Sequence, residues 1–330
     1  MTEPTRRTIA ITGASGFAGG HVVTELLKRC YRLKALVRDP AQAKFPDGVA
    51  VVKGDLGNDG ALSRLLEGAD CAVHLAGVLA ATKDRDYFCV NAHGTVAMAE
   101  AAIRLGVKRF VHVSSLAARQ PQLSPYAASK RAGEEAIAKL STKLNGIILR
   151  PPAVYGPGDR GTLPLIKQLT AAVAVIPGAK QSRFSLVHVG DLSRLIADAA
   201  ASDVGGLHEL SDGRQDGYGW NDLIAIASAF RGGPVRPLFL PFAIPAAVAV
   251  AGETLARVTG RPGMINRGKV RELYHPDWVC REGSLRLADP ITFASGFAET
   301  VAWYRAAGWL PPAPPADRTR ACALQSESQT

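Results

Sequence analysis

Residues 8–27, TIAITGASGFAGGHVVTELL, set the class of fold. A short β-branched apolar run is followed by an amphipathic helical pattern, with Gly13, Gly16 and Gly19 between the two. Glycine suits these positions because a Cβ would keep backbone N–H groups away from a pyrophosphate, and the amino end of the next helix offers partial positive charge. The strand–turn–helix context therefore predicts a dinucleotide-binding turn, the alternative being a glycine-rich turn without a ligand.

The same alternation continues through the first 155 residues. Apolar runs are separated by segments whose apolar residues recur at three and four, such as 18–30 and 94–106. This rhythm predicts an α/β fold, a doubly wound parallel sheet of the Rossmann type with helices on both faces. The predicted strands are residues 8–12, 32–38, 49–55, 71–77, 109–115 and 146–152.

The strict alternation ends beyond residue 155. Residues 1–155 predict the NAD(P)-binding domain, and we expect residues 182–212 to return to it through one more strand and helix. Residues 156–315 otherwise predict a smaller C-terminal lobe for the substrate, and the polar residues 316–330 predict a disordered tail.

Two segments of the second lobe have alternative interpretations. The apolar stretch 238–252 is short for a membrane span and contains two prolines, so a buried helix is favoured over an element at a membrane surface. The basic stretch 265–273 is interpreted as a solvated helix face, the alternative being contact with an acidic substrate or a lipid headgroup.

Composition limits the classes of function. The chain has 330 residues, 47% apolar and 21% charged, which is typical of a soluble globular enzyme. Its formal net charge of +10 favours anionic partners such as phosphate-bearing cofactors, and the scattered basic residues argue against nucleic acid. Five widely spaced cysteines without metal-ligand spacing, and an N-terminus without an apolar signal region, predict a cytoplasmic protein with no metal site.

The end of the second predicted strand bears on the choice of cofactor. An acidic residue there binds the ribose hydroxyls of NAD, whereas an arginine accommodates the 2′-phosphate of NADP. The strand ends Val37, Arg38, Asp39, and the register places Arg38 nearer the expected position. NADP(H) is therefore favoured over NAD(H). The alternative is that Arg38 and Asp39 are only a solvated charge pair with no role in cofactor binding.

Several motifs occur in an order typical of one family. The chain resembles the extended short-chain dehydrogenase/reductases, that is, the NAD(P)-dependent epimerase/dehydratase and 3β-hydroxysteroid-dehydrogenase-like proteins. The resemblance covers the first 160 residues closely, extends to about residue 200, and says little about the substrate. The motifs are TGASGFAG (12–19), GDL (54–56), HLAG (74–77), VNAHGT (90–95), VHVSS (111–115), YAASK (126–130) and RPPAVYGPGD (150–159).

The resemblance implies roles for four catalytic residues. Tyr126 would be the general acid/base, and Lys130, one helical turn later, would stabilise its phenolate together with the positive end of the helix. Ser115 would polarise the reacting oxygen. Asn91 would support the active site, the alternative being a helix N-cap. Taken alone, residues 124–133 are only a well-capped helix start.

The resemblance also implies a set of cofactor contacts. The glycine loop would hold the pyrophosphate, the segment after residue 54 the adenine, the segment after His74 the ribose, and the backbone after Arg150 the carboxamide. The residues are Gly13, Ser15, Gly16, Phe17, Gly19, Arg38, Asp55, Leu56, Leu75, Ala76, Gly77, Tyr126, Lys130, Pro151 and Val154.

Three functions remain open. The leading hypothesis is an NAD(P)(H)-dependent oxidoreductase acting on a hydroxyl/ketone carbon of a hydrophobic, sterol- or lipid-like small molecule. The alternatives are a nucleotide-sugar epimerase/dehydratase with a tightly bound cofactor and a non-enzymatic scaffold or redox sensor. Ala153 and Val154 replace an asparagine common in nucleotide-sugar enzymes, which counts against the sugar. A homodimer and peripheral membrane contact are further expectations.

Overall fold

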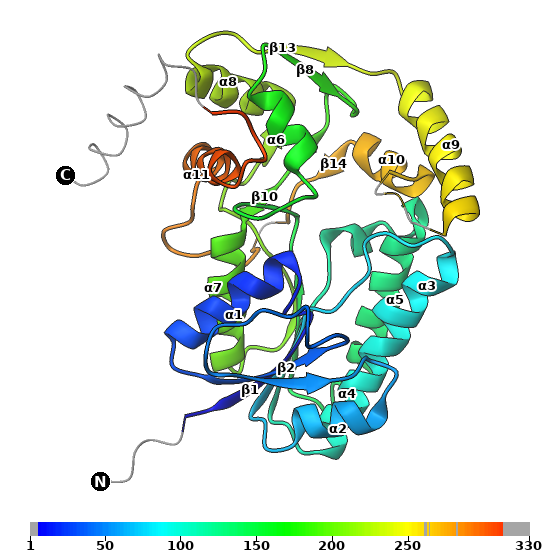
Figure 1. The fold of residues 1–330 in the computed structure, drawn as a ribbon, viewed down its shortest axis with the longest axis vertical. Coiled ribbons are helices and arrows are strands. Elements are labelled where there is room, and N and C mark those ends of the chain that lie inside the picture. The colour runs from blue at the N-terminus through cyan, green and yellow to red at the C-terminus, as the bar shows by residue number, and fades with distance from the viewer. Residues whose placement is uncertain (1–5, 261–262, 264, 282, 313–330) are drawn as a thin grey trace, which may run out of the picture.

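The computed structural model describes residues 6–260, 263, 265–281 and 283–312, and these form a parallel sheet with a second lobe above its carboxyl edge (Figure 1). The sheet has seven strands in the order β11-β6-β5-β4-β1-β2-β3, and every neighbouring pair is parallel. The strands are β1 (Thr8–Thr12), β2 (Arg32–Val37), β3 (Val49–Lys53), β4 (Cys71–His74), β5 (Arg109–Val113), β6 (Gly146–Arg150) and β11 (Gly206–Glu209).

Helices cover both faces of this sheet. On one face α1 (Phe17–Lys28) and α7 (Val189–Ala201) pack on Ile9 and Ile11. On the other, α2 (Asp59–Leu66), α4 (Gly94–Arg104) and α5 (Pro125–Lys139) pack on Ala10 and Phe110. Alternate residues of a strand point to opposite faces, so each strand contributes to both cores. The predicted doubly wound α/β fold is confirmed.

The chain returns to the sheet after its first excursion into the second lobe. β10 (Leu186–His188) pairs with β7 (Ala153–Tyr155), α7 then packs beside α1, and β11 becomes the edge strand next to β6. β10, α7 and β11 lie within residues 182–212, where the sequence predicts a return to the first domain. β1 lies between β2 and β4, so the winding reverses there, and sheets of this kind bind ligands outside the carboxyl ends of the strands at that point.

The second lobe has a separate core of aromatic and aliphatic side chains around Trp220, Phe297 and Tyr304. Short strands and helices surround it. They are α6 (Leu163–Leu169), β8 (Val173–Ile176), β9 (Arg183–Phe184), β12 (Tyr218–Gly219), α8 (Trp220–Arg231), β13 (Arg236–Phe239), α9 (Ala243–Thr259), α10 (Arg267–Tyr274), β14 (Asp277–Trp278) and α11 (Phe293–Ala306).

The prediction that residues 238–252 form a buried helix is wrong. The helix α9 forms, but of its own residues only Pro245, Ala249 and Ala256 are buried. Apolar content showed that a helix would form, whereas burial depends on neighbours, and α9 packs mainly against α10 at the edge of the lobe (Figure 1). Within the described ranges, no helix has both the length and the apolar character needed to cross a membrane. The predicted disordered tail, 316–330, lies outside the described residues.

Candidate active site

The predicted site residues lie along the carboxyl edge of the sheet. Gly13 follows β1, Leu75–Gly77 follow β4, Ser115 follows β5 and Pro151 follows β6. Because β6, β5, β4 and β1 are neighbours in that order, these segments lie side by side. Arg38, after β2, and Asp55, after β3, extend the row on the far side of β1. One extended ligand can therefore contact all of these segments.

The glycine loop is shaped by close backbone approaches. Gly13 has a φ of +76°, and a Cβ there would lie 2.7 Å from the backbone N of Ala76. A Cβ on Gly19 would lie 2.0 Å from the carbonyl oxygen of Gly13. Gly16 is the N-cap of α1, where no side chain caps the helix and no acidic residue occupies the first turn.

This loop fits the pyrophosphate of a dinucleotide. Ser15 and Gly16 are exposed and Phe17 begins α1, so the amino end of the helix is open to a ligand. Its first N–H groups and its dipole favour an anion. Glycine at the close-contact positions keeps the loop tight against the segment after β4, as a dinucleotide cradle requires.

The charged residues after β2 differ in their contacts. The Asp39 carboxylate accepts hydrogen bonds from Ala41 N (3.1 Å) and from Gln42 Nε2 (2.7 Å), so it is engaged by its own turn. Arg38 is exposed and forms no ion pair with any residue that the structure describes. After β3, Asp55 is also exposed and accepts a bond from Gly57 N (2.9 Å), while Leu56 packs on the core beneath α2 and α4.

Tyr126, Ser115 and Lys130 come together where α5 begins. Ser124 caps this helix by accepting a bond from Ala127 N (2.9 Å), and Tyr126 lies in its first turn. The Tyr126 hydroxyl is hydrogen-bonded to Ser115. Lys130 is buried one turn later, and its Nζ donates to the Val113 carbonyl (2.8 Å) at the end of β5.

Burial sets the protonation of both groups. It raises the pKa of Tyr126 to about 12, with a smaller contribution in the same direction from Glu272, while the hydrogen bond to Ser115 opposes the rise. Burial lowers the pKa of Lys130 to about 8, against the attraction of Glu134. In the structure Lys130 bonds to Val113 and not to Tyr126, so the expected stabilisation of a phenolate does not outweigh burial.

Asn91 lies inside a helical segment, so the alternative of a helix N-cap is wrong. It belongs to a π-helical turn (Cys89–His93) between α3 (Asp84–Phe88) and α4. Its side chain accepts from Val78 N (2.8 Å) and donates to Val78 O (3.1 Å) and Ser129 Oγ (2.9 Å). It thus joins the segment after β4 to α5, and π-helical turns are frequent at functional sites.

Three residues that sequence reasoning missed complete the site. The ring of Tyr87 lies edge-on to that of Tyr126, with centroids 6.4 Å apart. The Tyr87 hydroxyl accepts bonds from Ala81 N (3.1 Å) and Asn266 Nδ2 (3.3 Å). Glu272, on α10, accepts a hydrogen bond from the hydroxyl of Ser124. The second lobe therefore contacts the first turn of α5, and local sequence carries no signal for partners this far apart.

A buried ion pair holds β6 against α5. Arg150 donates to both carboxylate oxygens of Glu134 (2.8 and 2.6 Å), and Ser114 donates to the same carboxylate (2.5 Å). Pro151, the next residue, accepts a bond from Leu116 N (2.8 Å), while Val154 lies in β7 beside β10. The Ser114 hydroxyl is thus engaged by this buried ion pair, whereas the neighbouring Ser115 lies beside Tyr126.

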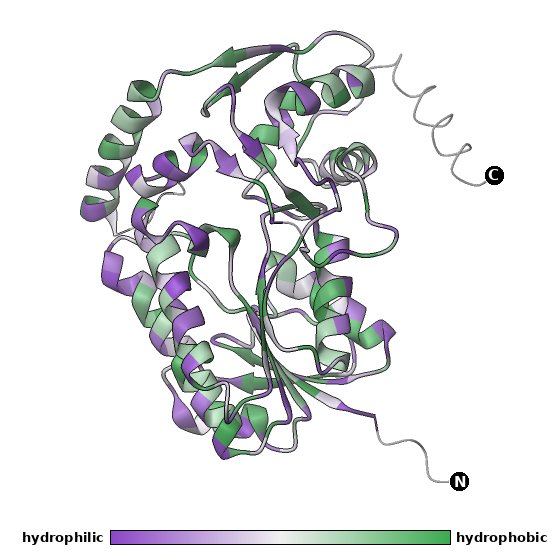
Figure 2. Cartoon of the chain, turned by 180° about the vertical axis from the view of Figure 1, so that it is seen from behind, coloured by the Kyte–Doolittle hydropathy of each residue, from purple (hydrophilic) through white to green (hydrophobic). Residues whose placement is uncertain are grey.

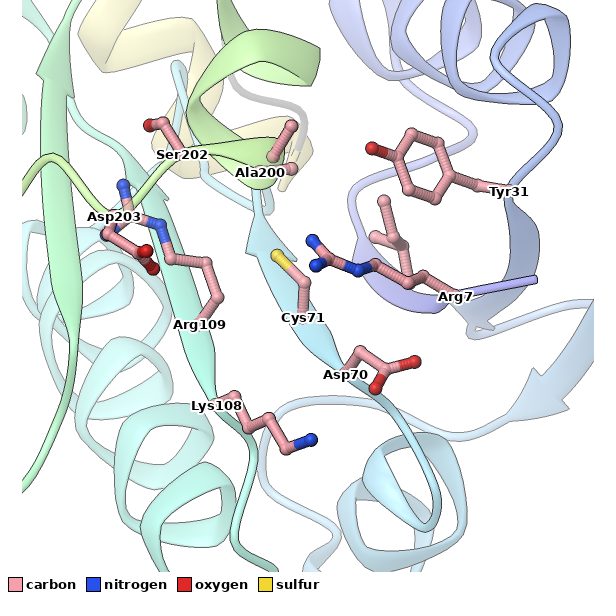
Figure 3. A pocket seen from close by; sticks show the side chains of 11 residues that line it. Arg7, Tyr31, Asp70, Cys71, Lys108, Arg109, Ala200, Ser202 and Asp203 are labelled. Carbon is pink, nitrogen blue, oxygen red and sulfur yellow. The ribbon is translucent and has the colours of Figure 1, made fainter. Parts of the chain in front are cut away.

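A cavity elsewhere in the domain does not belong to this site. Figure 3 shows it at the amino ends of β1, β4 and β5, where Cys71, Arg109 and Asp203 are among the lining residues. Burial raises the pKa of the Cys71 thiol to about 12, so it is no nucleophile at neutral pH. Arg109 is satisfied by Ala199 O, Asn145 Oδ1 and Val204 O. Ligands of doubly wound sheets bind at the opposite edge.

Comparison with known proteins supports this assignment of the fold. The family model described as "NAD dependent epimerase/dehydratase family" matches residues 9–209. A ceramide reductase of Caulobacter vibrioides is 42% identical over 316 residues, 94% of this chain and 98% of the relative. A sterol demethylase protein B of Methylococcus capsulatus is 28% identical, covering 92% of this chain and all of the relative. The crystal structure of a UDP-glucose 4-epimerase of Thermus thermophilus, in complex with NAD, matches with a TM-score of 0.64 at 21% identity over 91% of this chain and 99% of that one.

Proposed function

The chain belongs to the NAD dependent epimerase/dehydratase family, within the extended short-chain dehydrogenase/reductases, and from this premise we propose that it reduces the ketone of a lipid-like substrate with NADPH. The family match and the relatives show that the chain is an NAD(P)-dependent enzyme of this type. The choice of substrate, direction and coenzyme is our proposal.

The observation that carries the proposal is the state of Tyr126. With its pKa at about 12, the phenol is protonated at neutral pH, and it lies in the first turn of α5 beside Ser115, which follows β5. A protonated phenol is suited to give a proton to a ketone oxygen, whereas removal of a proton from an alcohol needs the phenolate. The protonated phenol fits the reductive direction that we propose.

The residues of the chain divide the work as follows. NADPH, when bound, supplies the hydride that reaches the carbonyl carbon. The glycine loop and the amino end of α1 hold the pyrophosphate of NADPH. Lys130 is close to Gly77, and the ribose of NADPH would pass beside Gly77. Ser115 donates a hydrogen bond to the substrate oxygen, and Tyr126 gives that oxygen its proton. The ketone thus gains a hydride at carbon and a proton at oxygen and leaves as the alcohol.

Arg38 supports NADP over NAD. Its guanidinium is exposed, and Asp39, the acidic candidate for the ribose hydroxyls, is already bonded to Ala41 and Gln42. An arginine presented here can pair with the 2′-phosphate.

The relatives support a lipid-like substrate. The ceramide reductase aligns over nearly the whole of both chains, second lobe included, and the sterol demethylase protein does so at lower identity. We propose a ketone of the ceramide class as the substrate to test first. A cytoplasmic location and a homodimer stay predictions of the sequence.

The test measures NADPH absorbance with a keto-ceramide and, separately, with UDP-glucose. Stoichiometric loss of NADPH with the lipid supports the proposal, while sugar interconversion without net loss would establish the epimerase alternative instead. Tyr126→Phe should lower kcat by about 10²- to 10⁴-fold with NADPH binding unchanged. Unaltered turnover in this variant would refute the role of Tyr126.

A further inference from the structure

The helix α9 presents an apolar stripe to solvent. Ile244, Val248, Leu255 and Val258 are 50%, 56%, 63% and 81% exposed. With Ala251 they recur at intervals of four, three, four and three residues, which places them on one side of an α-helix. Figure 2 shows α9 at the outer edge of the second lobe, green over much of its length. A contiguous exposed apolar face of this kind marks an interaction surface.

Positive charge accompanies this stripe. Residues 257–271, from the last turns of α9 into α10, contain five basic residues and no acidic one. Arg267 and Lys269 pair with Glu253 and Glu272, whereas Arg257 and Arg271 are exposed and form no ion pair within the described part of the chain. The surface therefore combines apolar side chains with uncompensated cations.

The stripe is connected to the active site through α10. Arg267, the first residue of α10, donates through its backbone N and its Nε to Glu253 of α9 (both 2.8 Å). Asn266, just before it, donates a hydrogen bond to the Tyr87 hydroxyl. Glu272 accepts a hydrogen bond from the hydroxyl of Ser124 at the start of α5. In Figure 1 α9 and α10 lie side by side above α3 and the amino end of α5.

We propose that α9 docks on the surface of an anionic lipid bilayer. Its apolar stripe enters the boundary between headgroups and acyl chains, and Arg257 and Arg271 pair with the anionic headgroups, as in other interfacial helices. A second copy of the chain fits the stripe less well, because two such faces would bring like charges together. The docking rests on α9 itself; its purpose, to give the active site access to a lipid-like substrate, rests on the proposed function.

The experiment is co-sedimentation of the full chain with vesicles of phosphatidylcholine, with and without phosphatidylglycerol. We expect binding that needs phosphatidylglycerol and weakens with added salt. The double variant Leu255→Glu/Val258→Glu should bind at least about tenfold more weakly, and Arg257→Gln about fivefold more weakly. Val204→Glu, at a 51% exposed valine before β11, is the matched control and should bind like the wild type.

Three results would overturn the proposal: no binding to anionic vesicles, equal binding of the α9 double variant and the control, or a dimer in analytical ultracentrifugation that this variant dissociates. NADPH oxidation with the keto-ceramide, dispersed in detergent, is measured in parallel. If vesicle binding depends on α9 but no keto-lipid is reduced, docking stands and the proposed function fails. If detergent-dispersed substrate is reduced and vesicles are not bound, the proposed function stands and docking fails.

Discussion

Replacement of Gly19 by alanine tests whether the loop is a cofactor cradle. The added Cβ would lie 2.0 Å from Gly13 O and 2.8 Å from the Cα of Ala14. Both atoms belong to the backbone, so no side-chain rotation relieves the clash. Real Cβ contacts essentially never fall below 3.0 Å, so the loop and α1 must separate by about 1 Å. A displacement of that size in positioning groups can weaken function about 10²-fold, and we expect the Kd for NADPH to rise by about that factor.

The adjacent glycine provides the control. Gly20 follows on the same helix, is exposed, and has nothing within 4 Å of the place that a Cβ would occupy. Gly20→Ala should leave the Kd unchanged and stabilise α1 by about 0.5–1 kcal/mol. Fluorescence titration with NADPH gives both Kd values, and circular dichroism and thermal unfolding establish that each variant is folded. A folded Gly19→Ala protein that binds NADPH within about threefold of the wild type would refute the cradle.

Three shorter predictions follow from the same contacts. Arg38→Ala should raise the Kd for NADPH about 10- to 100-fold and leave the Kd for NADH unchanged. If both Kd values rise by the same factor in titrations, Arg38 does not bind the 2′-phosphate. Because the pKa of Lys130 is about 8, its charge is present below that pH and lost above it, so kcat/KM for reduction should fall as pH rises through about 8; a flat pH–rate profile there would contradict this. Glu134→Gln should destabilise the fold by about 3 kcal/mol in thermal unfolding, since Arg150 would stay buried without its carboxylate, whereas Glu135→Gln, in an exposed pair, should change stability by less than about 0.5 kcal/mol.

The sheet and its active edge could be predicted because their signals are local. Each predicted strand of the first 155 residues forms, since short β-branched runs between amphipathic helices have one good solution, a parallel sheet covered on both faces. Strands of one direction end at one edge. Residues placed directly after strands, such as Gly13, Ala76 and Ser115, must therefore meet there whatever the loops between them do.

The second lobe could not be predicted in the same way. Ser124 and its partner Glu272 are 148 positions apart, and Tyr87 and Asn266 are 179 apart. No periodicity links such residues, and each contact depends on how irregular segments pack. The same limit explains α9: its composition predicts a helix, but whether its apolar side chains are covered depends on neighbours that the sequence does not identify.

The protonation of Tyr126 depends both on groups near it in the sequence and on groups far from it. Sequence reasoning weighed Lys130 and the positive helix end, which favour the phenolate. The structure adds burial and the charge of Glu272, which favour the phenol and prevail. Glu272 is bonded to Ser124, the cap of the helix that carries Tyr126, yet it belongs to the second lobe, beyond the residues 9–209 that match the family model. A group in the second lobe therefore contributes to the raised pKa of Tyr126, a residue of the first domain, so a change in that lobe should alter this pKa.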